Sequence, residues 1–174
     1  PSLAIVTNID REHLDFYRDM AHIQETFLAF LNRLPFYGLA ILCLDDPHLP
    51  ALIPQLKKRY RTYGLSAQAD LQARDVKQSG LLTAYRLFSG GREWGEIRFK
   101  LPGVHNVYNS LAAVAVGLEL EIPFAKIQAA FAELGGVQRR FQLKGTFHGA
   151  IVLDDYGHHP TEIETILRTA ALQE

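Results

Sequence analysis

Apolar runs and helical repeats alternate in the first third of the chain. The run 3–9 predicts a buried strand, and residues 22–34 carry apolar side chains at helical spacing. A second apolar run, 37–44, predicts a parallel strand that is covered on both faces. The stretch 45–59 predicts a helix that starts with acidic capping residues and a proline, and the basic run 57–61 suits its C-terminal end. This order of elements predicts an α/β fold with a parallel sheet.

The pattern changes toward alternation of apolar and polar residues over 70–101. Within this region the segments 81–88 and 93–101 flank the tetrapeptide Ser89-Gly90-Gly91-Arg92. Two alternating segments joined by a glycine pair are typical of a hairpin. The sequence therefore predicts an antiparallel hairpin region beside the parallel sheet.

The pattern in the last third of the chain predicts two helices and then a short segment of two strands and a helix. Residues 106–120 are dense in small and apolar side chains, and a further helix starts at Pro123 and ends near Gly135-Gly136. The elements expected after the glycine pair are a strand over 141–146, a buried strand over 150–153, and a helix from Pro160 that continues to Glu174. The glycine pair and the new element order predict a domain boundary, which divides the chain into 1–140 and 141–174.

Composition and charge exclude several classes of protein. The chain has 174 residues, 48% of them hydrophobic, and a formal net charge of -1, so no overall field favours nucleic acid or an anionic membrane. The single cysteine, Cys43, lies in an apolar run and is expected to be a reduced, packed thiol, as in the cytoplasm. The chain contains no run of about 18 apolar residues, so no membrane span is predicted.

The first polar cluster, 7–15, directly follows the first predicted strand. It contains Glu12, His13 and Asp15, and the loop beyond the carboxyl end of a parallel strand is where ligands collect in α/β sheets. Carboxylate oxygens and a neutral imidazole suit a divalent cation close to phosphate. The alternative is a solvated helix start, where acidic residues are also favoured.

The second polar cluster, 103–109, begins a predicted helix. Asn106 and Asn109 are three residues apart and therefore share one face of that helix. An amide side chain can pair with the edge of adenine, because it both accepts and donates a hydrogen bond. The alternative is that Asn106 simply caps the helix.

The third polar cluster has two parts, Arg139-Arg140-Phe141 and 154–160. A guanidinium group suits phosphate, and the acidic pair after a strand suits ribose hydroxyls or a metal. His158 and His159 lie between a glycine and a proline, where packing alone does not explain them. The alternatives are a solvated hinge for the arginines and a capped strand-to-helix turn for the rest.

These clusters, in this order, resemble the Mur ligase family and most closely its alanine-adding branch. The segments that carry the resemblance span nearly the whole chain: 7–17, 30–46, 103–109, 136–142 and 154–163. The resemblance implies part of a central ATP-binding domain with a parallel sheet and an antiparallel hairpin region, followed by the first elements of a Rossmann-like C-terminal domain. For the intact protein it implies ATP-dependent ligation of L-alanine to UDP-N-acetylmuramate through an acyl phosphate, in peptidoglycan biosynthesis.

The resemblance also implies roles for individual residues on the metal and substrate side. His13 would ligate Mg²⁺ close to ATP, with Glu12 and Asp15 shaping the same site. His158 and His159 would face the substrates. No protein partner or nucleic acid is implied.

On the nucleotide side, the resemblance implies that Asn106 and Asn109 hold adenine and that His105 supports their loop. Asp155 would meet the ribose, and Arg140 would stabilise charge on the transferring phosphoryl group. ATP and Mg²⁺ are therefore the expected cofactors.

The chain contains no Gly-Lys pair and hence no P-loop, so we expect this fragment alone to be inactive. Three alternatives stay open at this point. One is a non-catalytic nucleotide-binding or scaffold module, and another is a metal-dependent hydrolase that uses His13, His158 and His159. The third lies within the family and attaches a recycled tripeptide to the same sugar nucleotide.

Overall fold

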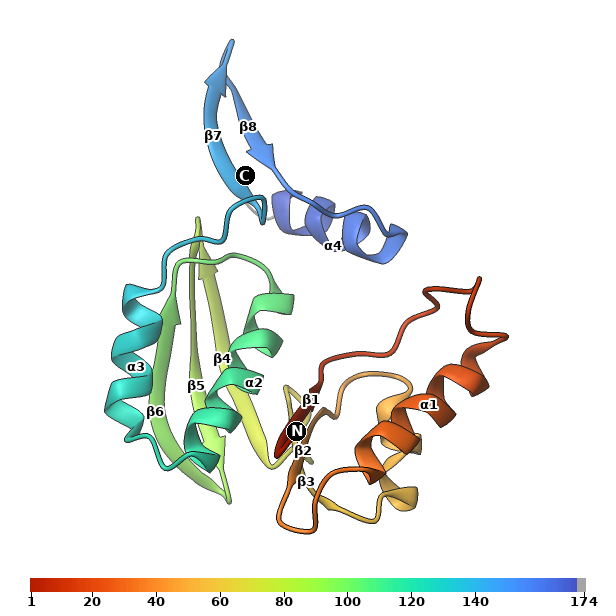
Figure 1. The fold of residues 1–174 in the computed structure, drawn as a ribbon. Coiled ribbons are helices and arrows are strands. Elements are labelled where there is room, and N and C mark those ends of the chain that lie inside the picture. Colours follow the sequence, from red (N-terminus) through yellow and green to blue (C-terminus); the bar gives the residue numbers. More distant parts are fainter. Residues whose placement is uncertain (172–174) are drawn as a thin grey trace.

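The computed structural model describes residues 1–171, in which one six-stranded sheet forms the main body (Figure 1). Its strands follow chain order: β1 Leu3–Val6, β2 Leu39–Cys43, β3 Arg59–Gly64, β4 Leu71–Ser79, β5 Leu82–Ser89 and β6 Arg92–Phe99. Neighbours from β1 to β4 are parallel, whereas β4, β5 and β6 pair antiparallel. The predicted α/β class, with an antiparallel region beside a parallel sheet, is confirmed.

Helices cover both faces of the parallel part of the sheet. Figure 1 shows α1 (Met20–Asn32) and α2 (Val104–Glu119) on either side of β1–β3, and all five residues of β2 are buried as a result. The Asp19 carboxylate caps α1 by accepting a hydrogen bond from the His22 N–H at 2.8 Å. The next helix, α3 (Phe124–Glu133), packs on β6.

The predicted hairpin is present as β5 and β6. Ser89 pairs with Arg92, and the two residues between them, Gly90 and Gly91, have φ angles of 60° and 76°. Two consecutive residues with positive φ define the tight turn whose twist matches that of a hairpin, and glycine adopts it without strain.

The predicted helix over 45–59 is wrong, and so is the interpretation of 57–61 as its end. Two short 3₁₀ helices, Leu49–Ala51 and Ile53–Gln55, are followed after three residues by β3. A proline at the start of the second one has no N–H to continue an α-helix. The basic residues start a strand instead, because β3 gains a full parallel ladder with β2.

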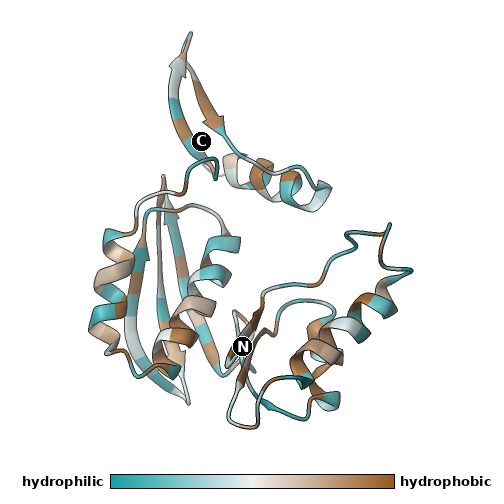
Figure 2. Ribbon diagram, viewed as in Figure 1, coloured by the Kyte–Doolittle hydropathy of each residue, from teal (hydrophilic) through white to brown (hydrophobic). Residues whose placement is uncertain are grey.

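The last segment forms β7 (Gln142–Phe147), β8 (Ala150–Asp154) and α4 (Pro160–Ala171), close to the predicted bounds. The antiparallel pair β7–β8 extends away from the large sheet (Figure 1), and β8 is coloured as hydrophobic in Figure 2. The expectation that 150–153 is buried is wrong, since Ile151 is 64% exposed and Val152 is 42% exposed. An apolar run predicts a strand, but burial also needs a covering layer.

The residues between α3 and β7 connect the two sheets, and the division into 1–140 and 141–174 stays a prediction. The expected continuation of the last helix over 172–174 lies outside the described residues. No helix within residues 1–171 has the length and apolar character needed to cross a bilayer.

Candidate functional site

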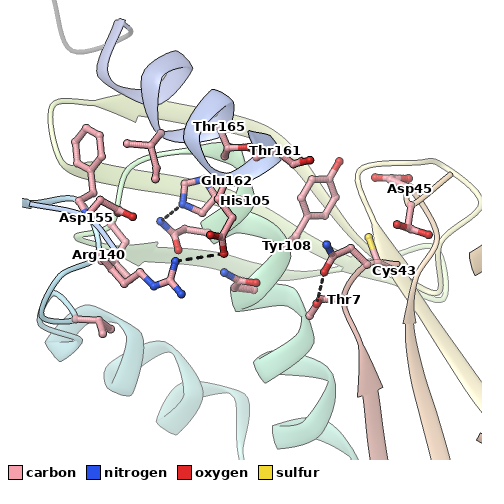
Figure 3. Close-up of a pocket in the computed structure, with 18 residues that line it drawn as sticks. Thr7, Cys43, Asp45, His105, Tyr108, Arg140, Asp155, Thr161, Glu162 and Thr165 are labelled. Carbon is pink, nitrogen blue, oxygen red and sulfur yellow. Dashed lines mark hydrogen bonds and ion pairs between the residues drawn. The ribbon is translucent and has the colours of Figure 1, made fainter. Parts of the chain in front are cut away.

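A cavity of about 700 Å³ lies at the carboxyl ends of β1 and β2 (Figure 3). The start of α2 forms another part of its wall, and the connection after α3 and the first half of α4 complete it. This volume is typical of pockets for nucleotide-sized ligands. Five of the predicted nucleotide-side residues line the cavity: His105, Asn106, Asn109, Arg140 and Asp155.

The two asparagines of α2 have different freedom to bind a ligand. The Asn106 Nδ2 group donates to the Pro102 carbonyl at 2.7 Å and lies 3.1 Å from His105 Nε2. Because a carbonyl only accepts, the Nδ2 group of Asn106 has to point toward Pro102. Both N–H groups of Asn106 are then used within the protein, and its amide oxygen is left to accept from a ligand. No side-chain hydrogen bond involves Asn109 within residues 1–171, and this residue is exposed. Asn109 can therefore both donate to and accept from a ligand.

His105 lies in the first turn of α2, near the buried Thr169 of α4. Burial lowers the pKa of His105, while Asp155 opposes this effect, so the ring is neutral and Nε2 accepts from Asn106. The proton then resides on Nδ1, which is buried and has no hydrogen-bond partner within residues 1–171. Gly103 has a φ of 95°, and a Cβ there would come within 2.7 Å of His105 Nδ1 and 2.8 Å of Thr169 Oγ1. Only glycine fits where these three residues meet.

Arg140 and Asp155 form the opposite wall. The residues on both sides of Arg140, Arg139 and Phe141, have positive φ angles of 56° and 46°, which turn the chain sharply. Asp155 holds this turn, because its carboxylate accepts from the N–H groups of Phe141 and Gly157, each at 2.7 Å. The Arg140 guanidinium lies 3.9 Å from a carboxylate oxygen of Glu162 on α4.

Asp45 and Tyr108 contribute a part of the wall that was not predicted from the sequence. The Asp45 carboxylate accepts from the Leu65 N–H at 2.5 Å and from the Ser66 N–H at 3.2 Å. Burial raises the pKa of Tyr108, and the Asp45 carboxylate raises it further. Asp45 follows β2 just as Asn8 follows β1, so the strand-end rule used for the first cluster would have found it.

Cys43 is buried as expected, although its side chain also lines the cavity. Burial raises the pKa of its thiol, which keeps it protonated at neutral pH. The expectation of a packed thiol is confirmed.

The predicted metal residues Glu12, His13 and Asp15 lie on the exposed loop between β1 and α1, outside the cavity wall. His13 has a positive φ of 54°, and its carbonyl accepts from the N–H groups of Phe16 and Tyr17. Within residues 1–171 no three His, Cys, Asp or Glu side chains gather closely enough to hold a metal ion. The metal roles of Glu12, His13 and Asp15 stay predictions.

The two predicted substrate-side histidines precede α4 and do not line the cavity. His158 is exposed, and its Nδ1 lies 3.1 Å from the Tyr156 carbonyl oxygen. His159 Nδ1 lies 3.7 Å from Asp10 Oδ2, in the loop after β1. Hydrogen bonds from the N–H groups of His158 and His159 lower the pKa of Glu162, so its carboxylate caps α4.

The sequence and the fold are similar to those of one protein family. The Mur ligase middle domain matches residues 1–117, so the chain belongs to the Mur ligase family. It is 58% identical over 171 residues to a UDP-N-acetylmuramate--L-alanine ligase of Syntrophobacter fumaroxidans, covering 98% of this chain and 36% of that relative. The chain thus spans little more than a third of the length of that curated relative.

Two solved structures have the same fold. UDP-N-acetylmuramate-alanine ligase MurC from Thermotoga maritima matches with a TM-score of 0.81 at 26% identity, over 99% of this chain and 39% of that one. MurF ligase from Thermotoga maritima, described in complex with ADP, matches with a TM-score of 0.79 at 20% identity, over 97% and 39% of the two chains.

Proposed function

We propose that this chain forms the adenosine side of an ATP-dependent ligase that joins L-alanine to UDP-N-acetylmuramate. The cavity carries this proposal, since Asn106 and Asn109 of α2 line it together with Arg140 and Asp155. The similarity to the Syntrophobacter ligase supports the choice of substrates. We further propose that residues 1–140 belong to the central ATP-binding domain and 141–174 to the start of the C-terminal domain.

The two walls offer complementary groups for a nucleoside. Asn106 presents an amide oxygen and Asn109 a whole amide, which together match the donor and acceptor on the edge of adenine. The Asp155 carboxylate has lone pairs beyond its two backbone contacts and can accept from a ribose hydroxyl. Arg140 also lines the cavity, and its guanidinium can neutralise phosphoryl oxygens.

The reaction needs ATP because a carboxylate is a poor electrophile. The carboxylate oxygen of the sugar nucleotide attacks the γ-phosphorus as the bond to ADP breaks, which gives an acyl phosphate. The amine of L-alanine then attacks the acyl carbon, and phosphate leaves as the nitrogen loses a proton. In this scheme Arg140 stabilises the negative charge that moves with the phosphoryl group.

Calorimetric titration of ADP into the full-length ligase tests the assignment of the asparagines. Asn109→Ala is expected to weaken ADP binding about tenfold, because an amide pairing with a base edge contributes about 1–3 kcal/mol. Gln55→Ala is the matched control, since it removes an exposed amide from a 3₁₀ helix outside the cavity. Equal ADP affinity of Asn109→Ala and the parent protein would overturn the assignment.

Phosphate release tests the activity itself. The full-length protein is expected to release phosphate from ATP only when UDP-N-acetylmuramate and L-alanine are both present, whereas the 174-residue chain alone is expected to release none above background. Release that depends on a tripeptide in place of L-alanine would identify the recycling ligase instead.

A further inference from the structure

The loop after β1 and the first turn of α4 meet at Asp10, although they are far apart in the sequence. Asp10 Oδ2 lies 3.7 Å from His159 Nδ1, and the two side chains are only 33% and 22% exposed. Asp10 therefore makes a polar contact with the residue that immediately precedes α4.

Asp10 is held firmly on the side of the large sheet. The preceding residue, Ile9, is buried, and its N–H donates to Asp46 Oδ2 at 3.1 Å. The other oxygen of Asp46 accepts from the N–H groups of His48 and Leu49 at 2.9 and 2.8 Å. The buried Asp46 carboxylate thus fixes the backbone next to Asp10 to the turn after β2.

The start of α4 is equally well defined. The Ile163 N–H donates to the His159 carbonyl at 3.0 Å, and Glu162 Oε2 accepts from the N–H groups of His158 and His159. The partner of Asp10, His159, is therefore tied to the first turn of α4 by its backbone, and the contact joins this turn to the loop after β1.

The other end of α4 also touches the body. Thr169 is buried beside Gly103 and His105, eight residues or about 12 Å of helix from Thr161. Between these ends, Thr165 and Ile166 line the cavity. Helix α4 therefore bridges the cavity, with Asp10 as its support at one end and the start of α2 as its support at the other.

We propose that Asp10 is a positioning residue that holds the first turn of α4 against the loop after β1 and so keeps the cavity closed. Asp10 does not line the cavity and acts only through α4. The identity of the ligand inside rests on the proposed function, whereas the contact itself does not.

A distance measurement on the full chain tests the contact without using activity. Spin labels at Ala29→Cys in α1 and Leu167→Cys in α4 are both on exposed positions, while the native Cys43 is buried. Asp10→Ala is expected to broaden the distance distribution and shift it to longer values. Asp10→Asn keeps an acceptor oxygen near His159 but loses the negative charge, so an intermediate shift is expected.

Glu25→Ala is the matched control, because it removes one exposed carboxylate from α1 that has no ion pair within residues 1–171. It is expected to leave the distance distribution unchanged. An Asp10→Ala distribution identical to that of the parent chain, in a variant with unchanged thermal unfolding, would overturn the proposal.

Kinetics of the full-length ligase provide the second readout. Asp10→Ala is expected to lower kcat about tenfold, because a displaced wall of the site no longer holds the reacting groups in the orientation that the reaction needs. The KM for ATP is expected to stay within about twofold, since the asparagine wall lies on α2 and does not depend on this contact. Asp10→Glu keeps the carboxylate and is expected to recover part of kcat.

The kinetic and distance results separate the two proposals. If the variants change the distance but the parent ligase shows no ATP-dependent activity, the proposed function fails and the contact stands. If kcat falls equally in Asp10→Ala, Asp10→Glu and Glu25→Ala, Asp10 has no positioning role and the proposal fails.

Discussion

Two strands of nearly the same composition have opposite environments in this molecule. Ile41 in β2 is 0% exposed, whereas Ile151 in β8 is 64% exposed. β2 has a parallel neighbour on each side and helices over both faces, while β8 pairs only with β7 in a hairpin that stands apart (Figure 1). Apolar composition thus determines that both segments become strands, and the layers around them determine how much each contributes to stability.

The same contrast holds for the polar contacts of the two regions. In the large sheet, the buried Asp46 joins three N–H groups from two separate loops. In the smaller segment, Asp155 accepts from the N–H groups of Phe141, before β7, and Gly157, after β8, and is partly accessible. Both carboxylates therefore join separate segments of the chain, and they differ in how deeply they are buried.

The largest expected difference comes from matched isoleucine substitutions. Ile41→Ala removes a fully buried side chain and is expected to lower the free energy of unfolding by about 2–5 kcal/mol. Ile151→Ala is expected to cost less than about 1 kcal/mol, because most of that side chain is in water. Urea unfolding of both variants measures the difference, and equal losses would contradict the contrast between the two strands.

The next comparison uses the two carboxylates. Asp46→Ala leaves three N–H groups without an acceptor in a buried place and is expected to cost about 2–3 kcal/mol. Asp155→Ala is expected to cost about 1 kcal/mol, since water can reach the groups it leaves. The same unfolding measurement applies, and a larger loss for Asp155→Ala would reverse the order.

A pair of glycine substitutions tests how tightly each region is packed. A Cβ on Gly64 would lie 2.7 Å from the Asp45 carboxylate, which is itself held by the Leu65 and Ser66 N–H groups, so Gly64→Ala is expected to cost about 1–3 kcal/mol. A Cβ on Gly157 would meet the flexible end of Ile166, and Gly157→Ala is expected to cost under about 1 kcal/mol. Thermal unfolding of the two variants measures whether Gly64→Ala loses more stability than Gly157→Ala.

The smallest effects concern pH, and they have opposite signs in the two regions. Burial raises the pKa of Tyr63 and of Tyr85, so their contribution to the body is complete below about pH 10 and is lost as the pH rises above it. The pKa of Asp10 and that of Glu162 are lowered, so their contribution at the start of α4 is present near neutral pH and is lost below about pH 4.

His105 adds to this acid sensitivity at the other end of α4. Its pKa is lowered by burial, so its contribution to stability is present above about pH 6.5 and declines as the pH falls through the folded-state value. Trp94 fluorescence follows the body and the label distance follows α4. Release of α4 before loss of the Trp94 signal on acidification is expected, and simultaneous loss would contradict it.

Much of the fold was predicted correctly from the sequence, and the strand that was missed, β3, has a clear physical reason. Glycine pairs, apolar runs and helical spacing are local signals, and they located β2, the β5–β6 hairpin and α2. The missing strand, β3, starts with exposed basic residues and becomes buried only from Thr62. Its ladder with β2 is a long-range interaction that no local pattern reveals.

For the site, the sequence indicated the groups that a ligand would need but not their final bonding. Asn106, Asn109, Arg140 and Asp155 do share one cavity. The use of both Asn106 N–H groups within the protein depends on the bend at Gly103, which only the fold defines. Tyr108 was missed because an aromatic residue in an apolar helix is indistinguishable from a core residue in sequence.

The change from parallel to antiparallel pairing at β4 has a consequence for how the chain folds. The strands β4, β5 and β6 are joined by turns of two residues, so their contacts are local and close quickly. The pairing of β1 with β2 has to wait for the whole α1 crossover to be ordered, at a much larger cost in loop entropy. We therefore expect amide protons of the β4–β6 meander to become protected from exchange first during refolding, and those of β1 last.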